Sequence, residues 1–237
     1  MTAAGLPWVF ALFSAGMLVA AGFGAQFGIW DYRLGFQLVR WSEYTGLATA
    51  ALALIWLVIP RFREGRILAL AAALAIGLGV AYFPWQWVQN ARSVPAINDI
   101  TTDTDDPPAF VALIAARAGA SVPAAYPGGE TAAKQRQGYP DIRPLELPVP
   151  PATAFARSLD AAKGMGWHVE AADAATGRIE ATATTPWFGF RDDVVVRVAR
   201  TPTGSRIDVR SVSRVGKSDL GANAKRIRAF LAKLAHA

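Results

Sequence analysis

The residues whose types and spacing could form a site lie near the C-terminus, on both sides of a short turn. Arg210, Ser213 and Arg214 come at the end of an expected strand, and Asp219 and Asn223 begin the closing helix. The turn would bring these two groups together. Asp219 and Asn223 are four residues apart and therefore share one face of the helix. The N-terminus of a helix also stabilises a negative charge such as that of Asp219.

Two roles fit this arrangement. In the first, Asp219 binds Arg210 or Arg214 and fixes the closing helix against the sheet. In the second, the arginines and the helix N-terminus together bind an anionic group from outside. We favour the first role, because an acidic residue in a first helical turn beside arginines is a common structural arrangement.

The sequence offers little else for catalysis. It contains no cysteine, which excludes disulfides, thiolate nucleophiles and cysteine-ligated metals. It has two histidines, His168 and His236, and no nucleophile elbow, His-Glu-x-x-His pair or phosphate loop. Asp103, Asp105 and Asp106 could hold a hard cation, but no glycine turn and trailing glutamate follow, so helix capping and solvation are the simpler interpretation. We therefore expect no cofactor and no metal, and we assign no catalytic residue.

Alternating apolar and polar residues predict four strands, near residues 167–171, 178–184, 192–199 and 206–210. Short links between them favour an antiparallel meander. Its apolar face would pack against helices. Its other face carries charges of both signs, which we expect to form a solvated ladder. These charged residues are Glu170, Arg178, Glu180, Arg197, Arg206, Asp208 and Arg210. The predicted fold class is α+β, with an antiparallel four-stranded sheet packed against helices.

Three further segments complete this domain. Asp106 and Pro107 predict the start of a short helix that ends at Gly119. Ala120–Pro150 carries six prolines and is expected to be an irregular, extended cover. The link Trp187–Phe190 places three aromatic residues where turns are usually polar. These side chains either enter the bilayer, close an apolar pocket or lie under the cover, and we slightly favour the cover.

Upstream, three apolar stretches predict membrane spans: Leu6–Ile29, Tyr44–Ile59 and Ile67–Phe83. The second is shorter, but Leu34–Val39 could extend it toward its N-terminus. The first has 24 residues without a charge, enough at about 1.5 Å per residue to cross a hydrocarbon core of about 30 Å. Because no Lys or Arg precedes Arg33, we expect a retained span rather than a cleaved signal peptide.

The change of composition near residue 90 predicts a transmembrane anchor in residues 1–90 and an aqueous α+β domain in residues 91–237. The link between the second and third spans contains Arg61, Arg63 and Arg66, and the positive-inside rule places it in the cytoplasm. The aqueous domain then lies outside the cytoplasmic membrane. We expect a multi-pass inner-membrane protein of a Gram-negative bacterium with its C-terminal domain in the periplasm.

The expected binding partners follow from the charge of the C-terminal region and from small residues in the spans. Arg191–Ala237 holds eleven basic and four acidic side chains, a net charge of +7. Outside the cytoplasm this charge favours anionic lipid headgroups over nucleic acid, with a solvated surface as the alternative. Small residues at every fourth position of spans one and three either pack the helices of one chain or form a homo-oligomer. These residues are Gly16, Ala20, Gly24 and Gly28, and Ala69, Ala73, Gly77 and Ala81.

Three separated motifs resemble those of the domain of unknown function 1499 family. They are Thr101–Pro108 (TTDTDDPP), Trp187–Asp193 (WFGFRDD) and Arg210–Asn223 (RSVSRVGKSDLGAN). The resemblance covers residues 97–234 and leaves the membrane part outside. The family is bacterial and plastid, and the resemblance implies no particular activity.

We expect a membrane-anchored, extracytoplasmic binding or structural module whose ligand is a lipid, an envelope component or a partner protein. The alternative is an envelope enzyme that uses the Asp, Arg and Asn residues of the motifs. An apolar pocket lined by the aromatic link would favour binding, whereas convergence of the motif's polar groups on one concave spot would favour the enzyme. The candidate ligand-binding residues are Asp105, Trp187, Phe190, Arg191, Asp192, Arg210, Ser213, Arg214, Asp219 and Asn223.

Overall fold

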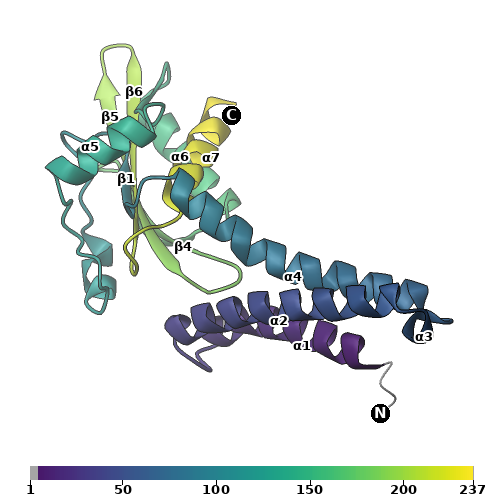
Figure 1. Cartoon of the computed structure of the whole chain (residues 1–237). Helices are drawn as coiled ribbons and strands as arrows, with labels where there is room; N and C mark the ends of the chain where they lie inside the picture. The colour runs from purple at the N-terminus through teal and green to yellow at the C-terminus, as the bar shows by residue number, and fades with distance from the viewer. Residues whose placement is uncertain (1–4, 237) are drawn as a thin grey trace. The chain divides into compact units, whose positions relative to one another are not determined.

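The structure is a computed structural model that describes residues 5–236. Packing divides the chain into two units. The helical unit contains Met1–Arg92 and the short segment Pro186–Gly189. The α+β unit contains Ser93–Thr185 and Phe190–Ala237. Figure 1 follows both units along the chain.

The helical unit is built from three long helices, α1 (Leu6–Gln26), α2 (Tyr32–Val58) and α4 (Ile67–Ser93), with the short α3 (Pro60–Arg63) between the last two. Each long helix is apolar and long enough to cross a membrane. The chain is therefore a membrane protein with three candidate spans. The second helix begins earlier than the predicted span, because the side chain of Asp31 accepts the backbone N–H of Arg33 and caps it.

Small residues allow these helices to approach closely. Ala11, Ala53 and Ala73, one from each long helix, are fully buried and form a common cluster. Gly46 and Gly77 mark the contact of α2 with α4, since a Cβ atom on Gly77 would lie 2.7 Å from the carbonyl oxygen of Gly46. The stripe of small residues on α4 therefore packs inside one chain at this point.

The sheet of the α+β unit has six strands within the described residues, not the four that we predicted. The predicted strands are present as β3 (His168–Asp173), β4 (Arg178–Thr184), β5 (Arg191–Thr201) and β6 (Gly204–Ser213), and they form an antiparallel meander. Two three-residue strands, β1 (Asp99–Thr101) and β2 (Leu145–Leu147), pair antiparallel with the free side of β6. Three residues are too few to establish a period of two, so the sequence pattern did not reveal them.

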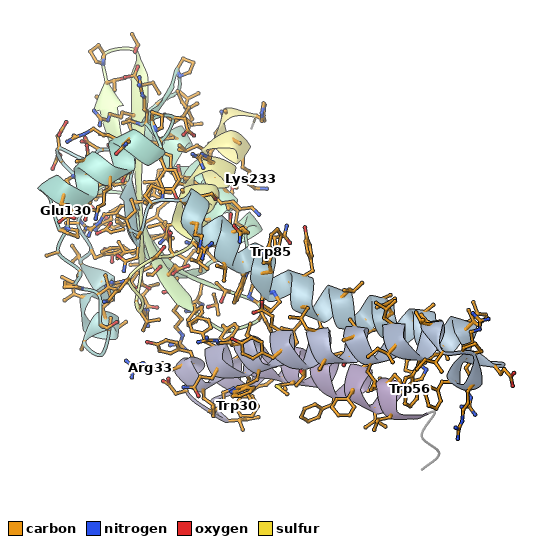
Figure 2. All side chains as sticks on the ribbon, viewed as in Figure 1. Trp30, Arg33, Trp56, Trp85, Glu130 and Lys233 are labelled. Atoms are coloured by element: carbon orange, nitrogen blue, oxygen red, sulfur yellow. The ribbon has the colours of Figure 1, made fainter. Side chains whose placement is uncertain are left out.

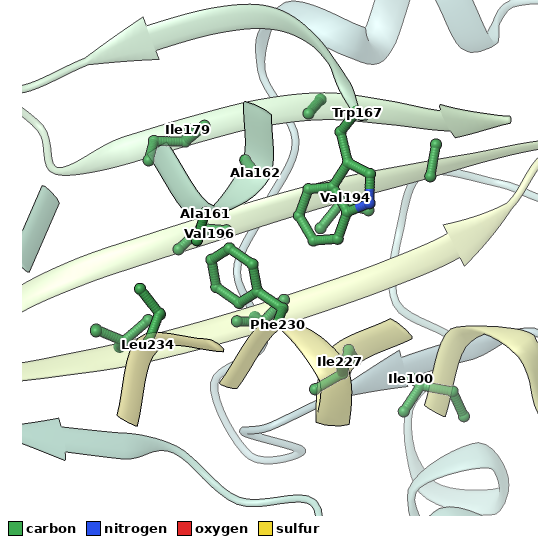
Figure 3. Packing of buried hydrophobic residues seen from close by; sticks show 14 of the residues in the cluster. Ile100, Ala161, Ala162, Trp167, Ile179, Val194, Val196, Ile227, Phe230 and Leu234 are labelled. Carbon is green, nitrogen blue, oxygen red and sulfur yellow. The ribbon is translucent and has the colours of Figure 1, made fainter. Parts of the chain in front are cut away.

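One face of the sheet packs against α6 (Pro151–Gly164) and α7 (Ala222–Ala235). Figure 3 shows this core, in which the rings of Trp167 and Phe230 stack with their centroids 5.1 Å apart. Ile227 and Leu234 extend the contact along α7, one helical turn on either side of Phe230. Both helices are amphipathic, and burial of their apolar faces closes the core.

The opposite face is not the solvated ladder that we expected. The segment Thr102–Tyr126, here called the covering segment, lies over it and buries Glu180, Asp208 and Arg210. Phe110, Leu113 and Val122 of this segment pack on Val195 and Val212 of the sheet. These three residues are therefore held in ion pairs away from water. The other charged residues of this face stay partly or fully exposed, namely Glu170, Arg178, Arg197 and Arg206.

The helix predicted between Pro107 and Gly119 is also different. The structure has a 3-10 helix over Ala112–Arg117, and Asp106 does not cap it. Instead, the Glu180 carboxylate accepts the backbone N–H groups of Val111, Ala112 and Leu113 at 2.8–3.2 Å. The Glu180 carboxylate, from strand β4, thus accepts the N–H groups that an N-cap residue would otherwise bind.

The predicted irregular cover, Ala120–Pro150, contains regular structure. Gly129–Gly138 forms helix α5, and Leu145–Leu147 is strand β2. Gln135 of α5 binds both backbone groups of Thr101, donating to its oxygen at 2.6 Å and accepting its N–H at 3.0 Å. The side chain therefore completes the hydrogen bonding of β1 at the edge of the sheet.

Candidate functional site

A group of polar residues lies between the end of the sheet and the start of α7. We call it the polar cluster, and it combines Asp192, Ser211, Ser213, Asp219, Asn223 and Arg226. Four of these residues were predicted as candidates: Asp192, Ser213, Asp219 and Asn223. Strands β5 and β6 supply the first three residues of the cluster, and α7 with the turn before it supplies the rest.

Asn223 and Arg226 connect the members of the cluster. Asn223 accepts the hydroxyl of Ser211 at 2.6 Å and donates to the hydroxyl of Ser213 at 3.0 Å. Arg226 donates to Asp192 at 2.6 Å and to Ser211 at 3.0 Å. Asp192 is almost fully buried, so Arg226 neutralises a charge that water does not reach.

Asp219 does not bind Arg210 or Arg214, which corrects the clamp that we favoured. Its carboxylate accepts the backbone N–H groups of Gly221 at 2.8 Å and of Asn223 at 2.9 Å, at the start of α7. The helix begins at Ala222, after Leu220 and Gly221 turn the chain with positive φ angles of 54° and 82°. Asp219 is therefore a cap of the closing helix.

Burial raises the pKa of Asp219 above its usual range. The backbone N–H groups of Asn223 and Gly221 oppose this shift, and the nearby charge of Asp192 adds to it. Two carboxylates thus lie close together in this cluster, one of them paired with Arg226 and the other held by backbone groups.

Arg210 belongs to the opposite face of the sheet. Its guanidinium binds the Asp99 carboxylate through two hydrogen bonds of 2.9 and 2.7 Å. It also donates to the carbonyl oxygens of Pro108 and Ala124, and it lies between the rings of Phe110 and Tyr126. Every one of these partners is in β1 or the covering segment, so Arg210 holds that segment on the sheet.

Arg214 binds Asp193 rather than Asp219, with contacts of 2.9 and 2.8 Å. Arg117 of the covering segment donates to the same carboxylate at 2.7 Å, and Thr182 adds a third donor at 2.8 Å. Although burial acts to raise it, these hydrogen bonds lower the pKa of Asp193 below its usual range. The carboxylate is ionised and fully enclosed by its donors.

Three other candidates lie apart from both faces. Asp105 is exposed and binds Arg136 at 3.3 Å. Arg191 is exposed at the start of β5, and its backbone oxygen accepts the N–H of Arg214. Phe190 is half-buried, and its backbone N–H donates to the hydroxyl of Thr185 at 2.9 Å. The candidates thus fall into several places rather than one concave spot.

The remaining candidate, Trp187, packs in the helical unit together with Phe188. Its indole N–H donates to the backbone oxygen of Val19 in α1 at 3.1 Å, and its ring lies 5.3 Å from that of Trp87 in α4. Phe188 is buried, with its ring 5.0 Å from that of Phe36 in α2. The Ala120–Pro150 segment therefore does not cover these two residues.

The part of the chain that matches a known family corresponds closely to the α+β unit. A family model described as "Protein of unknown function (DUF1499)" matches residues 99–234, more than half of the chain. The chain belongs to this family. No curated protein and no solved structure matches it.

The DUF1499 match begins at Asp99, the first residue of β1, and ends in α7. Its opening motif attaches the covering segment to the sheet. Thr102 accepts the backbone N–H of Val209, Asp103 binds Arg206 at 2.6 Å, and Asp106 binds Arg197 at 2.8 Å. The first DUF1499 motif therefore has a structural role, because it attaches the covering segment to the sheet. Asp105 differs from the other two aspartates, since its partner Arg136 is exposed.

Five residues that we did not predict as site candidates complete the polar cluster and the ion pairs beneath the covering segment. They are Asp99, Arg117, Glu180, Asp193 and Arg226. For Glu180 and Asp193 the available signal was a charged residue inside an alternating strand pattern, but the residues that they bind in the covering segment lie 67 and 76 positions away in sequence. Among residues 5–236, no group of three or more His, Asp or Glu side chains is placed to hold a metal ion.

Proposed function

We propose that this DUF1499 protein is a non-enzymatic module of a bacterial inner membrane that binds a lipid or another component of the envelope. Its three helices anchor it, and its α+β unit lies on the periplasmic side. The ion pairs of the polar cluster and those beneath the covering segment mainly stabilise the fold. The aromatic segment Pro186–Gly189 contributes to membrane contact.

The observation that carries this proposal is the position of Trp187 and Phe188. Both belong to a DUF1499 motif, yet both pack among aromatic residues of the candidate spans. Aromatic side chains, and Trp above all, favour the interface between hydrocarbon and water. The family domain thus contributes apolar contacts at the level of the bilayer, which a purely aqueous enzyme domain would not require.

The link between α2 and α4 supports the orientation. It carries Arg61, Arg63 and Arg66, whereas the link between α1 and α2 contains a single acid and no basic residue outside the helices. The positive-inside rule favours the cytoplasm for the first link, and α4 then leads outward.

The experiment isolates the full chain from native bacterial membranes in mild detergent and identifies retained lipids and proteins by mass spectrometry. The variant Trp187→Ala/Phe188→Ala is expected to lose a component that the wild type retains. Trp41→Ala is the matched control, because Trp41 is an aromatic residue of α2 that is 60% exposed and contacts neither residue. An identical set of retained components in the wild type and the double variant would contradict the proposal.

An envelope enzyme is the second candidate, and the pair Asp192 and Asp219 is the observation that favours it. A buried carboxylate with a raised pKa, such as Asp219, beside a second carboxylate is a feature of many acid–base sites. Asp219→Ala distinguishes the two roles, because a catalytic acid can be replaced without loss of stability. A structural cap cannot, and its replacement lowers the melting temperature.

A further inference from the structure

A groove of about 550 Å³ lies between α2 and α4, within the helical unit. It has one acidic residue, while its other lining residues are aromatic, aliphatic or small. The lining residues are Glu43, Leu47, Leu78, Gly79, Ala81, Tyr82 and Trp85. This groove is separate from the aromatic segment Pro186–Gly189, none of whose residues line it.

The depth of the groove follows from the lengths of the helices. A hydrocarbon core of about 30 Å corresponds to about 20 helical residues. Counted from the arginine-rich link at Pro60–Arg66, that length ends near Arg40 on α2 and near Trp85 on α4. Contact between Gly46 and Gly77 places the two helices in the same register. One end of the groove therefore lies at a membrane boundary.

Polar and apolar residues are divided along the groove in the way that a lipid requires. Glu43, Tyr82 and Trp85 lie at the boundary end, whereas Leu47 and Leu78 lie about one helical turn deeper. Both leucines are about half exposed in the helical unit, at 49% and 51%. The deep end is therefore suited to an acyl chain and the boundary end to a headgroup.

The two charges at the boundary end, Arg40 and Glu43, attract each other electrostatically, but no hydrogen bond or close ion pair joins them. Glu43 makes no hydrogen bond or ion pair with any described residue. Arg40, one turn earlier on α2, donates its Nε to the hydroxyl of Tyr44 at 3.0 Å, and its two terminal nitrogens make no hydrogen bond within residues 5–236. An ionisable residue at membrane depth is costly unless a partner compensates its charge.

We propose that the groove binds one phospholipid whose headgroup carries an amine beside its phosphate. The ammonium lies against the Glu43 carboxylate and the rings of Tyr82 and Trp85, which are 5.6 Å apart. The phosphate lies toward Arg40, and an acyl chain follows Leu47 and Leu78. Figure 2 locates Trp85 on α4. The inference deepens the lipid binding proposed above, but it uses none of the residues on which that proposal depends.

The test uses the full chain in nanodiscs of equimolar phosphatidylethanolamine and phosphatidylglycerol, with retained lipid measured by native mass spectrometry after mild detergent release. The wild type is expected to retain phosphatidylethanolamine in preference. Glu43→Gln should lower this preference about fivefold, as expected for the loss of one charged contact at a partly exposed site. Glu64→Gln in the link after α3 is the matched control and should retain the wild-type preference.

Charge reversal provides a readout that a structural role would not produce. Glu43→Lys is expected to shift the preference toward phosphatidylglycerol while the melting temperature in detergent changes little, because Glu43 has no hydrogen bond to lose and Arg40, whose charge it attracts, is exposed. Equal retention of both lipids by the wild type, or an unchanged preference in Glu43→Gln and Glu43→Lys, would overturn the proposal. So would a dimer in place of lipid adducts, since a second copy would then occupy the groove. If the Trp187→Ala/Phe188→Ala variant lost a retained component while both Glu43 variants kept the wild-type lipid preference, the proposed function would stand and the groove would be refuted as its site.

Discussion

Arg210 on β6 reaches diagonally to Asp99 on β1 and binds its carboxylate through both Nε and Nη2. Neither side chain is more than 2% exposed. Two of the three remaining guanidinium hydrogens bind the carbonyl oxygens of Pro108 and Ala124, so one side chain joins a strand edge to the covering segment. Planar, bidentate geometry of this kind is a property of arginine that lysine cannot reproduce.

Breaking this pair should be costly. Asp99→Asn leaves the Arg210 charge buried without a counterion, and we expect the free energy of unfolding of the α+β unit to fall by about 3–5 kcal/mol. Urea unfolding of the full chain in detergent, followed by circular dichroism, measures the change. Arg136→Gln is the control, since its ion pair with Asp105 is exposed and should change stability by less than about 1 kcal/mol. Equal losses in both variants would show that the buried pair has no special role.

Glu180 should control the covering segment. Glu180→Gln keeps the shape of the side chain but removes the charge that accepts three backbone N–H groups, and we expect a loss of about 1–3 kcal/mol. Limited proteolysis should then cut near Ala112–Arg117 faster than in the wild type. Glu170→Gln on the neighbouring strand β3 is the matched control, because Glu170 is exposed and holds no backbone group. Unchanged cleavage in Glu180→Gln would contradict this role.

The raised pKa of Asp219 predicts a dependence of stability on pH. Since burial raises the folded-state pKa above the ordinary value, the folded state binds the proton more tightly than the unfolded state. The contribution of protonated Asp219 is fully present below the ordinary pKa of about 3.9 and is lost as pH rises through the folded pKa.

Asp219→Asn should remove this loss. We expect the unfolding free energy of the wild type to fall relative to that of Asp219→Asn as pH rises from 3 to 7 (a range chosen to bracket the ordinary carboxyl pKa). Asp160→Asn, an exposed acid on α6, serves as the control. A constant difference between wild type and Asp219→Asn across this range would argue against a raised pKa.

Topology is tested directly with reporters. A reporter that is active only in the periplasm should be active when fused after Ala237 and silent when fused after Arg63, because the positive-inside rule favours the cytoplasm for the second link with its three arginines. Replacing Arg61, Arg63 and Arg66 with Gln should weaken this difference. Activity after Arg63 together with silence after Ala237 would place the α+β unit on the cytoplasmic side.

Local patterns in the sequence determined much of this protein. Apolar length alone identified the three long helices, and a period of two identified strands β3 to β6. The short links predicted between these strands are tight turns, with Thr201 paired to Gly204 and Asp173 accepting the N–H of Ala175. The family motifs were also recognisable. Each of these features depends on residues close together in sequence, where steric preference and burial produce a regular signal.

Only the tertiary structure decided which charges meet. Arg210 and Asp99 are 111 residues apart, and Arg117 and Asp193 are 76 apart, so no local period relates them. Asp219 binds backbone N–H groups instead of an arginine. Arg210 and Arg214 are not available to it, because they point to the other face of the sheet, where they bind Asp99 and Asp193. Ion pairs between distant segments are selected by the packing of the covering segment, and that packing is a property of the whole α+β unit.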